Sequence, residues 1–443
     1  MTNFLNLPNW EVGTVTENEH DYHVKATYKP LPEICPHCPP ALFGRVYRHG
    51  TMKQTVMDLP SHGKRVGIQL TRVRLRCQMC NKTCLQPVPD LDDRGTMTRR
   101  LVKYIEEQSL RKTFVAVADD VGLTEGTIRN LFGSHVKRLE AKTQFQTPER
   151  LGIDELFLIK KPRAVFTNLK ERTIIGVLDN RLKKSVTKHL LTLDAKAVKV
   201  VAIDMHRAYK DAVKESLPNA AIVVDKFHVV RMATKCLEAV RKSFRESLDA
   251  KVRRRLMNDR FVLLKRNKAL KPHEREMLAS WEKAFPKIGD AYRIKECFFG
   301  IWDSPDVATA KALFKDWEAM ATTDPEMTKA YKPLLTALRN WETEILAYFE
   351  HDETNAVTEA LNGIVRHIER NGRGYSFDVM RARMLFGSKA QKRPAYTGSS
   401  KVAFMLPDGS GPTYGASVDL LLKELEAENP NPTPEDSEQE EGE

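Results

Sequence analysis

The 443-residue sequence contains no apolar run long enough to cross a bilayer, and its first residues lack the basic-then-apolar pattern of a secretion signal. We therefore expect a cytoplasmic protein that is neither secreted nor inserted in a membrane. Cysteine is also scarce: there are seven, and five of them lie between Cys35 and Cys84. This clustering argues against a disulfide-built domain and favours metal binding. A chain of this length is expected to form roughly two to four domains.

Acidic residues are in deficit over most of the chain. The net charge is +12, but the nine acids that follow Lys423 have no basic residue among them, so residues 1–423 carry +21. A body this basic predicts a polyanionic partner, and nucleic acid is the usual one. Residues 391–443, which include the acidic and proline-rich end, are expected to form a flexible tail.

Two CxxC pairs are present, Cys35 with Cys38 and Cys77 with Cys80, about forty residues apart. Each CxxC turn directs two thiolates at one point, and the second pair completes a tetrahedron. Residues 1–92 are therefore predicted to form a zinc-ribbon DNA-binding domain with one structural Zn²⁺.

The segment between the pairs supports this interpretation. Residues 65–76 alternate apolar and polar side chains as a strand does. Zinc would replace an apolar core that so small a domain could barely build. His37 and Cys84 are nearby alternative ligands, but the two complete pairs already supply four thiolates.

Residues 93–147 are predicted to form a helix-turn-helix domain. Apolar residues mark the face of a first helix, Gly122 permits a tight turn, and Thr124 can cap the next helix. In this motif the second helix enters the major groove. The basic charge favours DNA binding over an ordinary helical hairpin, and we expect Arg129 and Asn130 to read base edges.

Three short β-branched runs end at acids, namely Asp154, Asp204 and Asp225. Each run is typical of a buried strand that carries a carboxylate at its tip. An ionised carboxylate beside an apolar strand costs free energy unless something compensates it, and a divalent cation is a common compensator. The pattern therefore predicts a metal site built on strand ends.

The elements around these acids are expected in the order β-β-β-α-β-α-β-α, which is that of the ribonuclease H-like fold. In that fold the fourth strand lies beside the first, so Asp154 and Asp204 would face one pocket. We predict a multidomain α/β protein whose catalytic core, residues 148–234 and 349–390, is interrupted by a large helical insertion at residues 235–348.

The predicted insertion is strongly basic. Residues 231–275 contain fifteen Lys or Arg against five acids, and the densest point is Arg253, Arg254 and Arg255. A charge run is usually a solvated helix face, but in a chain this basic a surface that grips phosphates is the better interpretation.

A glutamate beyond the insertion is the candidate third acid. Glu359 shares a helix face with Asn362 and Arg366, distinct from an apolar stripe on the same helix. Packed against the strand tips, its carboxylate could complete the metal site. Glu353 and Asp352 are the next candidates.

Four motifs together resemble the DDE transposases of bacterial insertion sequences. They are Gly-Ile-Asp154-Glu, Ile-Asp204-Met-His-Arg-Ala-Tyr, Val-Val-Asp225-Lys-Phe-His228-Val-Val and Asn-Ala-Val-Thr-Glu359-Ala-Leu-Asn-Gly. A zinc ribbon followed by a helix-turn-helix makes the chain similar to the ISL-three family in particular. The resemblance covers about residues 30–390.

The resemblance implies that Asp154, Asp204 and Glu359 are a catalytic triad that binds two Mg²⁺ (or Mn²⁺) ions. It implies that Asp225 and His228 are accessory residues near that site. It also implies that the two N-terminal modules bind the terminal inverted repeats of the element. The partners would then be repeat and target DNA on the bacterial nucleoid, and a further copy of the chain, because synapsing two ends requires at least a dimer.

The residues support this chemistry independently of the family resemblance. Phosphodiester cleavage needs an activated oxygen nucleophile and a stabilised leaving oxygen, and two metal ions about 4 Å apart provide both. Two other functions stay open: a DNA-binding regulator whose second domain only dimerises, and another ribonuclease H-like nuclease. The acids at strand tips argue against the regulator, while the basic insertion and the two DNA-binding modules favour a transposase over the nuclease.

Overall fold

The computed structural model describes residues 4–39, 44–244, 248–372 and 374–387. The described residues up to Gln144 form one compact unit, and those from Phe145 form a second. The predicted tail, residues 391–443, lies outside the described residues. Within the described part of the chain, every helix is too short or too polar to cross a membrane.

The first unit contains a five-stranded sheet in the order β1-β2-β4-β3, with β5 paired to β4. In β4 the predicted alternation of residues 65–76 is confirmed, because it buries Val66, Ile68 and Leu70 in the core of this sheet. β3 and β4 form a long antiparallel ladder that begins where Val46 faces Cys77. The strands are β1 (Trp10–Glu17), β2 (Asp21–Tyr28), β3 (Val46–Ser61), β4 (Lys64–Cys77) and β5 (Thr83–Leu85).

Three helices follow this sheet. Gly122 ends the second helix in the left-handed conformation, with φ 68°, which glycine adopts without strain. Thr124 caps the third helix, where its hydroxyl accepts a hydrogen bond from the Thr127 N–H at 3.3 Å. Both predicted turn residues are thus confirmed. The helices are α1 (Arg99–Ser109), α2 (Phe114–Val121) and α3 (Glu125–Lys142).

A buried acid joins the first helix to the sheet. Asp58 in β3 is 1% exposed, and it accepts hydrogen bonds from Thr98 Oγ1 at 2.6 Å and from Arg100 Nε at 2.8 Å. Thr98 is also the N-cap of α1. The sheet and α1 therefore share one polar anchor, at the end of β3 remote from Val46.

The second unit contains a mixed five-stranded sheet in the order β10-β9-β6-β7-β8. β6, β7 and β8 are antiparallel neighbours, while β9 and β10 are added in parallel. The predicted order of elements and the pairing of the fourth strand with the first are confirmed, which makes this sheet ribonuclease H-like. Its elements are β6 (Arg150–Leu158), β7 (Lys161–Asn168), β8 (Thr173–Val177), α4 (Lys183–Leu190), β9 (Val200–Ile203), α5 (Arg207–Ser216) and β10 (Ala221–Val224).

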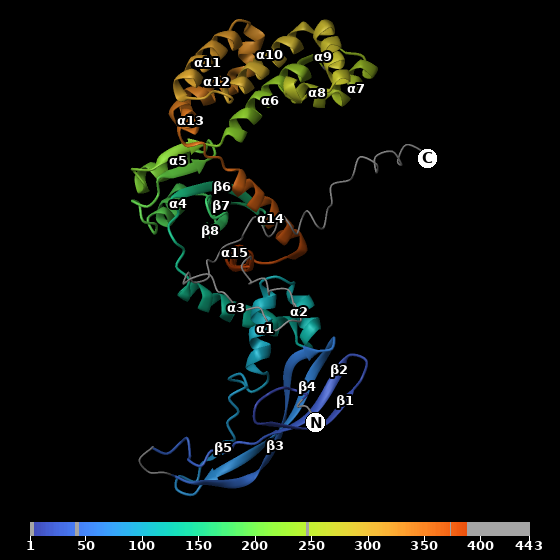
Figure 1. Ribbon diagram of the computed structural model, residues 1–443, viewed down its shortest axis with the longest axis vertical. Helices are drawn as coiled ribbons and strands as arrows, with labels where there is room; N and C mark the ends of the chain where they lie inside the picture. The colour runs from blue at the N-terminus through green and yellow to red at the C-terminus, as the bar shows by residue number, and fades with distance from the viewer. Residues whose placement is uncertain (1–3, 40–43, 245–247, 373, 388–443) are drawn as a thin grey trace, which may run out of the picture. The chain divides into compact units, whose positions relative to one another are not determined.

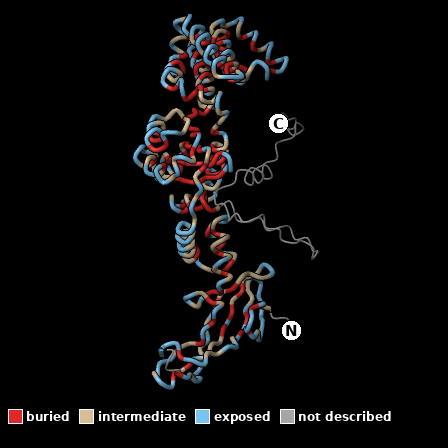
Figure 2. Tube along the Cα trace, turned by 60° about the vertical axis from the view of Figure 1, so that its left-hand side comes forward, coloured by how far each residue is buried: buried red, intermediate tan, exposed pale blue. Residues whose placement is uncertain are grey.

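α6 (Lys226–Ser243) leaves this sheet and leads into the helical insertion (Figure 1). The insertion and the sheet share one continuous apolar core, and Figure 2 shows the buried positions along both. All four tryptophans of the insertion are buried in that core. The helices are α7 (Ala250–Asn258), α8 (Arg260–Leu264), α9 (Pro272–Ala284), α10 (Pro286–Ile301), α11 (Val307–Ala321) and α12 (Pro325–Leu346), with a 3-10 turn at Asn267–Ala269.

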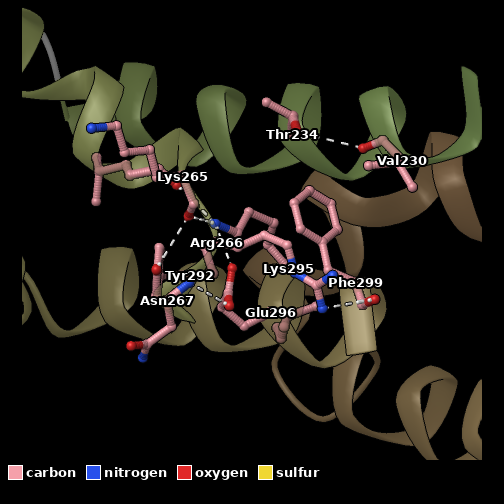
Figure 3. Close-up of polar contacts among 12 residues, drawn as sticks. Val230, Thr234, Lys265, Arg266, Asn267, Tyr292, Lys295, Glu296 and Phe299 are labelled. Atoms are coloured by element: carbon pink, nitrogen blue, oxygen red, sulfur yellow. Dashed lines mark hydrogen bonds and ion pairs between the residues drawn. The ribbon is translucent and has the colours of Figure 1, made fainter. Parts of the chain in front are cut away.

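One lysine of the insertion is wholly buried. The Lys295 ammonium donates hydrogen bonds to the backbone oxygens of Leu263 at 3.0 Å and Lys265 at 2.6 Å, and pairs with Glu296 at 2.8 Å (Figure 3). It thereby satisfies carbonyls left without intrahelical partners at the end of α8. Burial lowers the pKa of Lys295 to about 8. The hydrogen bonds of Lys295 are used inside the insertion, so this ammonium is not available to a phosphate.

After the insertion the chain returns to the sheet. The short α13 (Tyr348–His351) precedes α14 (Ala356–Gly372), which packs against β6. The last described helix, α15 (Phe377–Phe386), packs against β8. α14 therefore carries Glu359 to the strand that carries Asp154.

Candidate active site and cysteine cluster

Three acids lie at neighbouring positions on the sheet. Asp204 and Asp225 directly follow β9 and β10, and Asp154 lies in β6 just beyond its last pair with β9. β6 does not end at Asp154, as the sequence pattern predicted, but continues to Leu158. The reason is that β7 still pairs with this part of β6 after β9 has ended. The predicted adjacency of the strands nevertheless places the acids at one edge.

A histidine joins two of these acids. His228 Nδ1 lies 3.0 Å from Asp204 Oδ1 and 3.2 Å from Asp225 Oδ2. The ligand atoms of the three residues all lie within 4.8 Å of one another. Hydrogen bonds with Asp204 and Asp225 raise the pKa of His228 to about 10, so the imidazole is charged at neutral pH. The Asp-x-x-His pair is therefore part of the cluster, where Asp225 also caps α6.

Asp154 is held in place by two donors. It is 5% exposed; one oxygen accepts from the Glu155 N–H at 2.6 Å, and the other accepts from Asn362 Nδ2 at 2.6 Å. Burial and the nearby Asp204 carboxylate raise the pKa of Asp154 to about 8. Carboxylates this close can be ionised together only if a positive charge compensates them. Oxygen donors with that need fit a hard divalent cation.

Sequence reasoning gave Asn362 no role. The signal that could have found it is its spacing, because residue i+3 shares a helix face with Glu359 and points to the same partner strand. Arg366, predicted on that face, is exposed and makes no contact with the cluster among the described residues. The amide of Asn362 therefore orients Asp154, while Arg366 stays at the surface.

Glu359 lies within electrostatic reach of the cluster. Burial and the Asp225 carboxylate raise its pKa, while the charged His228 lowers it. The two alternative acids are placed differently: Glu353 forms an ion pair with Arg150, and Asp352 is exposed at the end of α13. These positions favour Glu359 as the third acid, and the assignment stays a prediction.

A polar seam docks the start of α14 on β6. Thr358 Oγ1 lies 2.7 Å from Thr167 Oγ1, and the Asn355 side chain donates to a β6 carbonyl at 3.4 Å. The Asn355 N–H also donates to Asp225 Oδ1 at 3.4 Å. A Cβ atom on Gly152 of β6 would lie 2.4 Å from Thr167 Oγ1 and 2.7 Å from Thr358 Oγ1. Only glycine at this position lets the helix that carries Glu359 approach the strand.

The four thiols of the two CxxC pairs gather in the first unit. Their sulfur atoms lie within 4.8 Å of one another, and two of the distances between the pairs are 3.7 Å each. Sulfurs about 2.3 Å from a tetrahedral zinc ion would lie about 3.8 Å apart, so the cluster fits zinc. Neither alternative, His37 nor Cys84, belongs to this group of described residues. The members are Cys35, Cys38, Cys77 and Cys80.

Backbone groups complete this cluster. The Met79 N–H donates to Cys77 Sγ at 3.3 Å, and the N–H groups of Cys80 and Met79 lower the pKa of Cys77 to about 6. A Cβ atom on Gly44 would lie 2.8 Å from Cys38 Sγ, so glycine is required where the chain passes the sulfurs. The sequence spacing predicted the four thiols, but Gly44 belongs to neither CxxC turn, so that spacing did not predict its role.

The predicted DNA contacts occupy two surfaces. Arg129 and Asn130 are both exposed on α3; the Arg129 guanidinium pairs with Glu125 and lies 5.0 Å from the centre of the Phe114 ring. On α7 the arginines at 253–255 are also exposed, and none forms an ion pair with another described residue. The first surface is therefore held in a defined geometry, whereas the second presents charge that no described acid neutralises.

Comparison with known proteins decides the family. A profile described as a transposase, of the DDE type named for ISL3, matches residues 151–384, which is more than half of the chain. The chain belongs to the ISL3 (ISL-three) family of DDE transposases. The helix-turn-helix domain of transposase family ISL3 matches residues 86–136, and the zinc finger of transposases IS204/IS1001/IS1096/IS1165 matches residues 31–80.

The ISL3 transposase is also similar to a curated relative. It is 25% identical over 335 residues to the transposase for insertion sequence element IS1001 from Bordetella parapertussis, which covers 74% of this chain and 82% of that protein. The resemblance inferred from the motifs is thus confirmed. The ribbon, the helix-turn-helix and the DDE domain follow one another in the predicted order.

In this transposase, Gly152→Ala is expected to displace α14, because the added methyl group would overlap the Thr167 and Thr358 hydroxyls. Overpacking of this kind costs about 1–3 kcal/mol, so the midpoint of urea unfolding should fall. Gly363→Ala, on α14 itself, is the control, since its added Cβ would meet nothing beyond its own helix backbone and chain neighbours within 4 Å. It should leave stability unchanged or raise it by about 1 kcal/mol or less. Equal stability of the two variants would contradict this account of the seam.

Proposed function

We propose that this ISL3 transposase binds the terminal inverted repeats of an insertion sequence and catalyses cation-dependent strand cleavage and strand transfer into target DNA. The observation that carries the proposal is the cluster of Asp154, Asp204, Asp225 and His228, with Glu359 on the helix packed against it. In a family of DDE transposases, Asp154, Asp204 and Glu359 are the acids that the resemblance assigns to catalysis.

We assign Asp154, Asp204 and Glu359 as ligands of two Mg²⁺ or Mn²⁺ ions, with Asp225 and His228 as accessory residues. When bound, such ions stabilise charge on the attacking and leaving oxygens of an in-line displacement. The protein's own contribution is orientation: Asn362 holds one oxygen of Asp154 at 2.6 Å. His228 supplies a positive charge that keeps Asp204 and Asp225 together.

We assign the four clustered thiols to one structural Zn²⁺, which supports the sheet of the first unit. DNA recognition is proposed to divide between base readout by α3 and phosphate contacts by α7. We propose that the protein acts as at least a dimer, because two ends must be synapsed. Because its substrate is chromosomal DNA, we propose that it acts at the nucleoid in the bacterial cytoplasm.

The test of this function uses purified protein, Mg²⁺ and two duplexes of equal length, one of which ends in the terminal repeat. We expect strand cleavage at the element end alone, and none after chelation of the cation. Cleavage of both duplexes alike would indicate a nuclease without end specificity. Tight binding to the repeat with no cleavage would instead indicate a regulator.

Arg129→Ala is expected to weaken binding to the true repeat by about 1–3 kcal/mol and to change binding to random DNA little, because α3 is proposed to read base edges. Glu125→Ala is the control: it releases the ion pair with Arg129 but keeps the guanidinium, so repeat affinity should be kept. Binding isotherms on both duplexes measure the difference. Asn130→Ala should behave as Arg129→Ala does. Equal weakening of both duplexes by Arg129→Ala would mean that α3 contacts only the backbone.

The triple Arg253/Arg254/Arg255→Ala variant is expected to weaken binding to both duplexes and to make the affinity fall less steeply with salt. Each lost phosphate contact lowers the slope of log affinity against log salt by about 0.9. The control is a second triple alanine variant at basic residues that are already paired with acids. It should change the salt dependence of the affinity less. If the arginine triple changed only repeat binding, the two surfaces would be assigned backwards. The control residues are Lys287, Arg293 and Lys311.

A further inference from the structure

A pocket lies beside Asp204, between the segment that follows β9 and one face of α6. On α6 its residues are spaced by three and four, so they share a helix face with His228. Its volume of about 280 Å³ is near the lower end of the range for ligand pockets, about 300–1,000 Å³. That volume suits one ring system and not a duplex. The lining residues used below are Met205, His206, Tyr209, Arg231, Met232 and Lys235.

The wall of the pocket is aromatic and polarizable. The His206 and Tyr209 rings are 4.5 Å apart between centroids, with an angle of 40° between their planes. Met205 and Met232 add two half-buried thioethers. Such groups favour flat, polarizable rings, on which aromatic side chains stack.

Two polar atoms in this wall have no partner. Tyr209 is wholly buried, and its hydroxyl forms no hydrogen bond with any described residue; the same is true of His206 Nδ1. A buried polar atom without a partner costs free energy, so the retention of these two side chains points to a use in the pocket. That use is the accessible ring of His206, because both polar atoms are themselves enclosed.

The mouth of the pocket carries positive charge. Arg231 and Lys235 are exposed and lie one helical turn apart on α6, and neither forms an ion pair with another described residue. Phosphates beside the occupied pocket would meet these two cations. The pocket therefore combines an aromatic and thioether wall with a phosphate-binding rim, all next to Asp204.

We propose that this pocket receives one nucleobase of the DNA, turned out of the helical stack next to the cleaved phosphate. The proposal rests on the proposed function, because it takes Asp204 as part of the cleavage site. The base stacks on the accessible part of the His206 ring, which itself packs on the Tyr209 ring, and its flanking phosphates bind Arg231 and Lys235. A paired and stacked base cannot enter, so an unpaired or easily opened position at the element end is favoured.

The test is photo-crosslinking of the full-length protein, with Ca²⁺ replacing Mg²⁺ so that the DNA stays uncut. 5-Iodouracil replaces the base at each position around the cleaved phosphate in turn, and mass spectrometry identifies the attached peptide. We expect one position to crosslink to residues 205–209 or 231–235. Crosslinks that reach only other peptides, or none from any position, would overturn the proposal. Free 5-iodo-2′-deoxyuridine that crosslinks equally well would overturn it too, since the pocket would then take free nucleosides.

Variants distinguish a loss of binding in the pocket from a general loss of folding or of DNA binding. His206→Ala and Arg231→Ala are expected to reduce the crosslink yield several-fold while complex formation with the repeat is kept. Lys242→Ala removes the same charge from an exposed position at the far end of α6 and should leave the yield unchanged. A yield that is the same in all three variants would contradict the proposal.

The same wild-type protein is tested with Mg²⁺ on the same repeat duplex. Cleavage without any crosslink to the pocket overturns this inference and leaves the proposed function intact. A folded wild-type protein that binds the repeat and does not cut it overturns the proposed function, and the pocket assignment with it.

Discussion

Replacing Asp154, Asp204 or Glu359 with Ala is expected to abolish strand cleavage while the affinity for the terminal repeat stays nearly unchanged. A metal ion contributes several kcal/mol to the stabilisation of transition-state charge, so loss of its binding should lower the rate by about a thousandfold or more. Repeat binding should survive because the ribbon and α3 belong to the other unit of the chain.

A control variant and a thermal-unfolding measurement test this prediction further. Glu353→Ala is the control, because Glu353 is paired with Arg150 outside the cluster, and it should cleave as the wild type does. If Glu359→Ala cleaved normally and Glu353→Ala did not, the third acid would be wrongly assigned. Thermal unfolding should show that Asp154→Ala melts no lower than the wild type. Burial and Asp204 raise the pKa of Asp154, so its ionised form destabilises the folded state at neutral pH.

Cys77→Ser is expected to release the zinc ion, to unfold the cysteine end of the β3–β4 ladder and to weaken repeat binding severely. Structural zinc contributes about 10–16 kcal/mol in zinc-finger peptides, more than this end of the sheet can replace. The far end should persist, because Asp58 remains bonded to Thr98 and Arg100. Metal analysis should find one zinc per wild-type chain and none in the variant, and cleavage-site residues should keep their fold.

Cys84→Ser is the matched control for that variant. Cys84 pairs with Leu75 in the sheet but lies outside the group of four thiols, so its variant should keep both the zinc and the repeat binding. Wild-type protein that is folded, binds the repeat and contains no zinc would contradict the assignment. Loss of zinc from Cys84→Ser with retention in Cys77→Ser would mean that the fourth ligand is misplaced.

Local pattern predicted the parts of this protein whose causes are local. β-branched runs that end at acids predicted β9 and β10, and the spacing of two CxxC turns predicted the thiol cluster. Gly122 and Thr124 were recognisable because turn and cap geometry depend on single residues. The fold class followed from the order of these elements, since few topologies accept that order.

The rest depends on contacts between segments far apart in the chain. Gly152, Thr167 and Thr358 form the seam that docks α14, and about 200 residues separate the first from the last. Nothing in the pattern around Gly152 indicates a helix that returns from beyond the insertion. Lys295 is a second example, because its buried position is decided by the carbonyls at the end of α8 and not by its neighbours in the sequence.

The most direct test of the central claim is a strand-transfer measurement. Purified protein, Mg²⁺, a radiolabelled terminal-repeat duplex and a supercoiled plasmid are incubated together, and the label is followed on a denaturing gel. We predict that the labelled 3′ strand becomes covalently joined to the plasmid, and that the joined product disappears with Glu359→Ala. A repeat that is bound, or even cut, but never joined to the plasmid would contradict the account.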